Sequence, residues 1–124
     1  MTPTQMRSQA ARNRTEANVL DESARTLRSV ATSIDGLLSG IAGMSRMVWQ
    51  GPAATQFEEE AEMHSRNLND QAGILDGEAG GFESRARALR SDANWLIAEA
   101  ARIEAAAAAA AAAAEPSQTP GGVS

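Results

Sequence analysis

One histidine and a run of carboxylates are the residues of this sequence whose chemistry could serve metal binding or catalysis. His64 follows Glu60 by four positions, which is about one turn of a helix and a spacing that two ligands of one metal ion can share. The chain has a single His and no Cys, so further ligands of the usual kinds are missing. We therefore expect no metal site and interpret His64 as a polar residue of a helical seam.

The carboxylates at positions 58, 59, 60 and 62 form the densest acidic cluster of the chain. Near the first turns of a helix, negative charge is favoured by the helix dipole, so a solvated helix face explains the cluster without any chemistry. Catalysis by paired carboxylates requires a concave site, and the chain has neither a nucleophile motif nor a phosphate-binding loop. The sequence predicts no catalytic residues, no cofactor and no enzymatic activity.

Composition favours an all-α protein of one small domain. The 124 residues are 43% hydrophobic but only 3% aromatic, and the four prolines stand at positions 3, 52, 116 and 120. An alanine-rich chain with few β-branched residues favours helices over sheets. The net charge of -5 disfavours nucleic acid as a partner. We expect no stable membrane insertion and no cleavable signal peptide, because no apolar run reaches about 18 residues and the N-terminus is polar.

The first helix is expected over residues 3–48. Thr2 can act as N-cap, Pro3 suits the first helical position, and Gln5 can reach back as in a capping box. The apolar residues then recur in steps of three and four, which keeps them on one face. The large residues of this helix that we expect to pack, within the hairpin or in a dimer, are Leu20, Leu27, Ile34, Leu37 and Ile41.

A turn is expected at residues 49–51, and a second helix from residue 52. Gly51 tolerates turn geometry, and Pro52 fits the first turn of a new helix. The packing residues of the second helix are Phe57, Leu68, Leu75, Phe82, Leu89 and Leu96. Glycines at 73, 77, 80 and 81 leave a soft or broken stretch at 76–81 as an alternative, but the unbroken seven-residue phase favours a continuous helix.

The C-terminal part divides into two segments outside the hairpin, which we place at residues 3–104. Residues 105–114 are ten consecutive alanines, which predict a helical extension without large side chains to pack. Residues 115–124 contain Pro, Gly, Ser and Thr and have the composition of a disordered tail.

A short turn makes the two helices antiparallel neighbours, so residues whose numbers add to about 100 should face each other. Phe57 would then meet Gly43, and His64 would meet Gly36, so that Gly36, Gly40 and Gly43 allow close approach of the backbones. Residues 1–50 hold six Arg and four acids, whereas residues 51–124 hold five Arg and twelve acids. These opposite charges favour helices that lie side by side.

The apolar stripe is wider than one seam between two helices can cover. On the first helix it is flanked by Ala24, Ala31, Leu38 and Met47, which we expect to stay uncovered in the hairpin. Pairing with a second hairpin would bury this surface, so we expect a dimer that forms a four-helix bundle. Polar residues on the seam, Asn13, His64 and Gln71, indicate selective pairing.

The turn sequence resembles that of a known family. Trp49-Gln50-Gly51, followed by Pro52-Ala53-Ala54 and Phe57, is similar to the motif of the WXG family, the ESAT-like substrates of type VII secretion. The resemblance covers residues 3–104 and implies a helical hairpin that dimerises and leaves actinobacterial or related Gram-positive cells folded, through a membrane ATPase. It also implies a second signal near the end of the second helix, an aromatic residue followed four positions later by an acid, and Trp95 and Glu99 have this spacing with Trp where Tyr is usual.

The resulting functional hypothesis is a secreted or secretion-associated protein that pairs with itself or with a paralogous hairpin. At 1.5 Å per residue, Trp95 lies roughly 65 Å along the second helix from Trp49, so only an antiparallel dimer could bring the two signals together. The first alternative is a cytoplasmic adaptor or chaperone for a larger secreted toxin. The second is an amphipathic protein of lipid surfaces, which the acidic charge disfavours.

Overall fold

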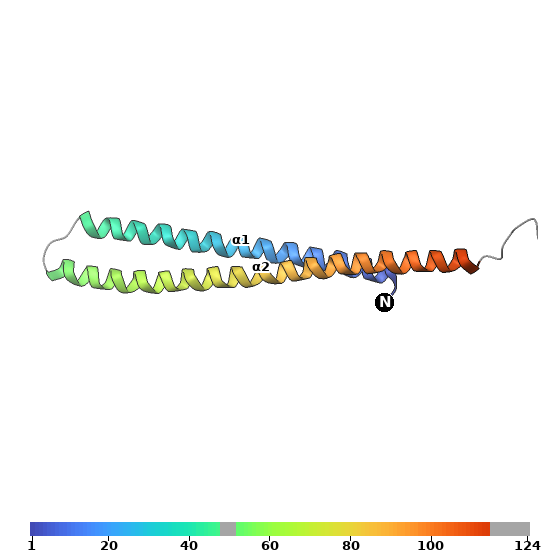
Figure 1. Cartoon of the computed structure of the whole chain (residues 1–124). Coiled ribbons are helices and arrows are strands. Elements are labelled where there is room, and N and C mark those ends of the chain that lie inside the picture. The colour runs from blue at the N-terminus through green and yellow to red at the C-terminus, as the bar shows by residue number, and fades with distance from the viewer. Residues whose placement is uncertain (48–51, 115–124) are drawn as a thin grey trace, which may run out of the picture. The chain divides into compact units, whose positions relative to one another are not determined.

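The chain is an all-α helical hairpin (Figure 1). The computed structural model describes residues 1–47 and 52–114, and in these ranges it contains two helices and no strand. Helix α1 spans Pro3–Met47 and helix α2 spans Pro52–Ala114. In the described part neither helix has an apolar stretch long enough to cross a membrane. The fold class that composition and periodicity predict is confirmed, while Trp49 and Gly51 lie outside the described residues.

Helix α1 begins with the capping box that the sequence predicts. The backbone N–H of Gln5 donates to Thr2 Oγ1 at 3.1 Å, and the backbone N–H of Thr2 donates to Gln5 Oε1 at 2.8 Å. The N–H of Met6 donates to the carbonyl of Thr2 at 2.9 Å and closes the first turn. Free backbone donors at the helix start are therefore satisfied by the side chains of the same turn.

Helix α2 is continuous through its glycine-rich stretch. Residues 73–81 are helical throughout, so the alternative of a break at 76–81 is not what the structure shows. Ala79 is fully buried in the middle of this stretch. Packing of the residues between the glycines therefore offsets the cost of the glycines themselves.

The hairpin divides into two compact units. Unit 1 combines Met1–Ala17, which includes the start of α1, with the part of α2 from Arg87 onward, and unit 2 comprises Asn18–Ala86. Each unit pairs a stretch of α1 with an antiparallel stretch of α2, and each contains its own buried residues.

The centre of the seam in both units is formed by alanines that recur every seven residues. In unit 1 these are Ala10, Ala17, Ala93 and Ala100, and in unit 2 they are Ala24, Ala31, Ala72, Ala79 and Ala86; none is more than 4% exposed. Small side chains let two helix axes approach closely, and a buried alanine loses little side-chain entropy. The seam is therefore built around methyl groups.

The alanine seam corrects our expectation about the flank of the stripe. Ala24 and Ala31 were expected to stay uncovered, but they are 2% and 3% exposed and lie at the seam's centre. The predicted packing residues three positions after the alanines are half-buried instead, namely Leu20, Leu27, Ile34, Leu75, Phe82, Leu89 and Leu96, and so is Leu68, three positions after Ser65. Larger side chains cannot occupy the closest approach of two helices, so the leucines pack beside it.

Two of the residues expected to pack in the hairpin or in the dimer lie outside the hairpin seam. Leu37 is 62% exposed and Phe57 is 44% exposed, so neither packs in the seam, while the side chain of Ile41 lies outside the described part. A methyl group added to Gly36 or Gly40 would meet nothing within 4 Å, so these glycines do not enable close helix approach. In this part of α1 the buried or half-buried residues are Ala31, Ile34 and Leu38, and Gly36 and Gly40 lie on exposed faces of the helix.

The register also differs from the one that the turn position predicts. Ion pairs join residue 28 to residues 76 and 83 in unit 2, and residue 7 to residue 104 in unit 1. The residue numbers of each pair add to more than the value of about 100 expected from the turn. The pairing brings the alanines of α1 and α2 into one common seam. His64 and Gln71 are exposed, whereas Asn13 is buried as predicted.

Candidate interaction surface

One side of the helix pair carries interhelical ion pairs between arginines of α1 and acidic residues of α2. In unit 2, Arg28 Nε donates to Glu83 Oε1 at 3.0 Å, and its Nη1 lies 3.6 Å from Asp76 Oδ1. In unit 1, Arg7 Nη2 donates to Glu104 Oε2 at 2.7 Å. Four of the residues in these pairs stand four positions after a buried alanine, namely Arg28, Asp76, Glu83 and Glu104. We call this side of each unit the charged side.

The opposite side of unit 2 is apolar. With 100° of rotation per residue, the residue three positions after a buried alanine lies on one side of that alanine, and the residue four positions after it lies on the other side. The residues four positions after the alanines form the charged side, so the residues three positions after the alanines lie on the opposite side of the helix pair. In unit 2 the third residues include Leu27, Ile34, Leu75 and Phe82.

In unit 2 the apolar side widens into an exposed surface. Val30 and Leu37 stand on α1 next to Leu27 and Ile34, and they are 45% and 62% exposed. Phe57 and Leu68 extend the same side on α2. We call the surface formed by Leu27, Val30, Ile34, Leu37, Phe57 and Leu68 the apolar patch. Exposed apolar surfaces of this kind mark sites of protein association.

A groove lies in the α2 part of the apolar patch. Its volume is about 560 Å³, and Phe57, Ala61 and Leu68 supply its apolar lining. Glu60 and His64 add polar groups to the same groove. The described residues contain no group of three His, Cys, Asp or Glu side chains that could hold a metal ion. Asn67 and Gln71 complete the lining of the groove, which thus combines apolar and polar side chains.

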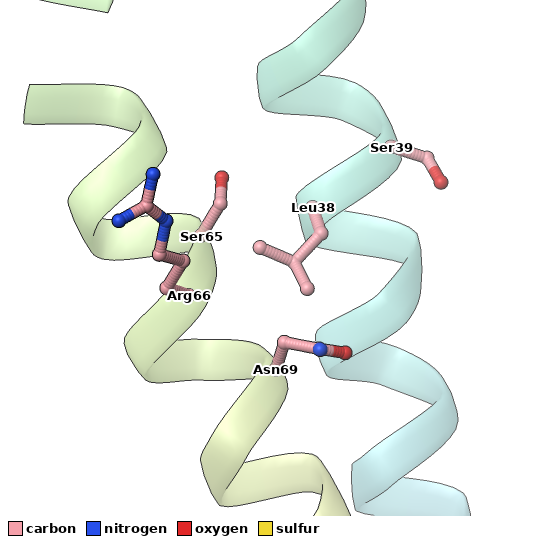
Figure 2. A pocket seen from close by; sticks show the side chains of 5 residues that line it. All are labelled: Leu38, Ser39, Ser65, Arg66 and Asn69. Carbon is pink, nitrogen blue, oxygen red and sulfur yellow. The ribbon is translucent and has the colours of Figure 1, made fainter. Parts of the chain in front are cut away.

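The seam loosens in the same part of unit 2. The seven-residue spacing of the seam alanines reaches Leu38 after Ala31 in α1 and Ser65 before Ala72 in α2. At these two positions the seam therefore has a leucine and a serine in place of alanine. Figure 2 shows Leu38 pointing from α1 toward α2, where Ser65 and Asn69 face it across a pocket of about 420 Å³. A leucine at an alanine position keeps the helices from closing, so no described side chain from 32 to 40 or from 55 to 71 is buried.

The second sequence-predicted signal lies in unit 1. Trp95 is 61% exposed, and Glu99 stands one turn further along α2. Arg102 Nε donates to Glu99 Oε2 at 3.0 Å. This hydrogen bond lowers the pKa of Glu99 and raises that of Arg102. The site thus presents an open indole beside an ionised carboxylate that is already paired with an arginine.

Among the residues whose side chains the structure describes, Asn13 is the buried polar one in the seam. It is 8% exposed, and its Oδ1 accepts a hydrogen bond from Gln9 Nε2 at 2.8 Å. The partner is one turn away on the same helix, so the polar group is satisfied without a residue of α2.

Sequence reasoning missed two features of this surface. The first is the role of the alanines, although their seven-residue spacing was visible in the sequence. The second is Arg102, three residues after Glu99, whose spacing is typical of helical ion pairs. Comparison of the chain with protein-family models, curated proteins and solved structures gave no match.

Proposed function

We propose that this protein is a non-enzymatic substrate or partner protein of type VII secretion, and that it works as one half of a dimeric helical bundle. The observation that carries the proposal is the apolar patch of unit 2, where Val30, Leu37 and Phe57 are exposed on one side of a helix pair. Removing such surface from water contributes about 25 cal/mol per Å². A second helical hairpin supplies a matching surface, because two helix pairs form a four-helix bundle.

The secretion part of the proposal rests on the WXG-like turn sequence and on Trp95 with Glu99. Trp95 has no role in the hairpin seam, since most of its side chain is exposed. An exposed aromatic residue beside a charged pair is suited to recognition by another protein. The partners in this proposal are a second WXG-type hairpin and the secretion ATPase.

Export is tested with the variants Trp95→Ala and Glu99→Ala expressed in the native host. We expect both to stay inside the cells, while the unchanged protein appears in the culture filtrate. Ile74→Ala is the matched control, because Ile74 is a similarly exposed apolar residue of α2 in unit 2. Circular dichroism of the purified variants separates a lost signal from a lost fold.

The unchanged protein must itself be exported for this proposal to stand. Retention in the cytoplasm together with a co-purifying larger protein would favour the adaptor alternative instead. Export of both variants at the level of the control would show that Trp95 and Glu99 are ordinary surface residues.

Association through the apolar patch is tested with Leu37→Glu. A charged residue in the middle of the patch should abolish pairing and leave the helix content unchanged, because Leu37 is outside the hairpin seam. Val19→Glu is the control, since Val19 is 56% exposed on the same helix but outside the patch. Sedimentation and partner co-purification measure the outcome, and equal behaviour of the two variants would contradict the proposal.

A further inference from the structure

Five exposed residues of α1 recur in steps of three and four outside the seam. They alternate in size, because large apolar side chains stand between residues no bigger than threonine, and the set is Thr26, Val30, Ser33, Leu37 and Gly40. We call this set the α1 line. Its large residues are seven positions apart, and so are its small residues. The alanine seam has the same alternation of small and large side chains, and there it serves the pairing of two helices.

The hydroxyl groups of the α1 line are satisfied within the helix. Thr26 Oγ1 donates to the carbonyl of Glu22 at 3.1 Å, and Ser33 Oγ donates to the carbonyl of Ser29 at 3.0 Å. A helix packed on the line therefore leaves neither donor without an acceptor, which avoids the usual cost of burying a hydroxyl group. An added methyl group at Gly40 would meet nothing within 4 Å, so the space above this glycine is open to a side chain of another molecule.

No charged residue lies on the same side of α1 as the α1 line between residues 26 and 40. The charged residues of this stretch are Arg28 and Asp35. Each stands four positions after a buried alanine, which places it on the charged side of unit 2. A charged residue on a helix that packs against the α1 line would therefore lose its hydration without gaining a counter-charge. The line requires an uncharged contact face on its partner.

Helix α1 of a second copy meets this requirement. Val30 and Leu37 stand six positions after the alanines of α1, and the corresponding positions of α2 hold Glu78 and Arg85. Contact of α1 with this side of α2 would set both charges against apolar side chains. Contact of α1 with α1 sets no charge there, and it closes about a twofold axis because the same surface serves both copies.

We propose that the α1 line is the contact surface of a homodimer, in which it packs antiparallel against the α1 line of a second copy. The inference rests on the proposed function, in which the protein pairs through the apolar patch, and it names the partner and the helix that makes the contact. In one antiparallel register Leu37 lies opposite Ser33 of the second copy, and Val30 lies opposite Gly40. Each large side chain then meets a small one, and the twofold axis repeats both contacts.

Paired cysteines test this arrangement, because the chain has no cysteine of its own. The double variant Val30→Cys with Gly40→Cys carries its thiols roughly 15 Å apart along one helix, too far for a disulfide within the chain. In the antiparallel homodimer each thiol lies next to the other thiol of the second copy, so mild oxidation should give a covalent dimer on a non-reducing gel. Ile74→Cys with Ser84→Cys is the matched control, since it has the same spacing on an exposed face of α2 in the same unit, and it should stay a monomer.

The cross-linking has clear contrary outcomes. Absence of a covalent dimer from the double variant, or an equal yield from the control, overturns the inference. A covalent dimer from Val30→Cys alone, at the yield of the double variant, also overturns it, because only a parallel pairing brings this position next to itself.

Sedimentation of variants without cysteine measures the contribution of the α1 line. Ser33→Arg should raise the dissociation constant of the dimer at least about tenfold, because the new charge loses its hydration in the contact. Ser91→Arg is the control, an exposed serine of α2 outside the α1 line, and circular dichroism checks the helix content of both. The dimer should persist in 1 M salt, where charges are screened beyond about 3 Å. Equal dissociation constants for the two variants, or a dimer that dissociates at high salt, overturn the inference.

Co-purification from the native host separates this inference from the proposed function. A purified protein that is a monomer without cross-link, but that pairs in the host with another helical protein through Leu37, overturns the homodimer and leaves pairing through the patch intact. If the protein is a monomer and Leu37→Glu changes no assembly in the host, the proposed function is overturned as well.

Discussion

At the scale of single residues, the size of the side chain decides which apolar residue lies in the seam. Ala24 and Ala79 are 2% and 0% exposed, whereas Leu27 and Leu75, three positions later, are only half-buried. Hydrophobicity alone ranks the leucines first, but the closest approach of two helices has room only for a methyl group. The alanines are therefore the residues whose substitution should disturb the pairing most.

The first prediction is that Ala79→Leu destabilises the hairpin by about 1 to 3 kcal/mol. The larger side chain must push the two helices of unit 2 apart or adopt a strained rotamer. Ala88→Leu is the control, because Ala88 is exposed on the same helix and has space for a leucine. Urea unfolding followed by circular dichroism measures the difference, and equal stabilities of the two variants would show that the seam is not closely packed.

The second prediction concerns the Arg7–Glu104 ion pair of unit 1. The hydrogen bond from Arg7 holds the pKa of Glu104 below its ordinary value of 4.5. A carboxyl with a lowered pKa adds stability that is fully present above pH 4.5 and is lost as the pH falls through its lower folded value.

The stability difference between the unchanged chain and Glu104→Gln should therefore disappear in acid. Melting temperatures measured from pH 7 down to about pH 2 give this difference at each pH. A difference that stays constant across the range would mean that the Glu104 carboxylate has no role in it. The pair is exposed, so we expect a small effect at every pH.

At the scale of the elements, α2 maintains one helical phase across four glycines. An added methyl group at Gly73, Gly77, Gly80 or Gly81 would meet nothing within 4 Å. No close approach of another backbone requires a glycine at these positions, and they only weaken the helix locally. Buried alanines and half-buried leucines on the same turns keep it continuous.

The third prediction is that Gly77→Ala stabilises the protein by about 0.5 to 1 kcal/mol, the usual advantage of alanine over glycine inside a helix. The same gain is expected for Gly36→Ala in α1, where an added methyl group also has open space. Chemical unfolding measures both variants. If Gly36 enabled close packing of the helices, as the turn-based register predicts, Gly36→Ala would destabilise the protein instead.

At the scale of the whole molecule, the two sides of unit 2 have different character. The charged side holds Arg28 with its two acidic partners, and the apolar patch lies on the other side. The chain as a whole carries a net charge of -5. An amphipathic surface next to acidic residues suits a protein partner better than an anionic lipid surface.

The fourth prediction is that the protein does not bind anionic vesicles, even at low salt. Membrane surfaces with negative charge attract basic amphipathic helices and repel acidic ones. Co-sedimentation with phosphatidylserine-containing and with neutral vesicles makes the comparison. Binding to the anionic vesicles alone would revive the lipid-surface alternative and would contradict the pairing role of the patch.

Much of the fold follows from the sequence by itself. Alanine content and the scarcity of β-branched residues determine the helical class, and Thr2, Pro3 and Gln5 determine where α1 begins, because these effects act within one turn of the chain. The seven-residue phase from Leu75 to Leu89 likewise predicted a continuous α2. Each of these features depends on local backbone energetics.

The register and the exposed surface were decided only by the tertiary structure. Periodicity places alanines and leucines on one stripe, but it does not say which of them lies at the closest approach of two helices. That choice depends on side-chain volume on both helices at once, and it buries Ala31 while leaving Val30 and Leu37 exposed. The apolar patch therefore emerges only when α1 and α2 are packed together, since its members are the apolar side chains that the alanine seam cannot accommodate.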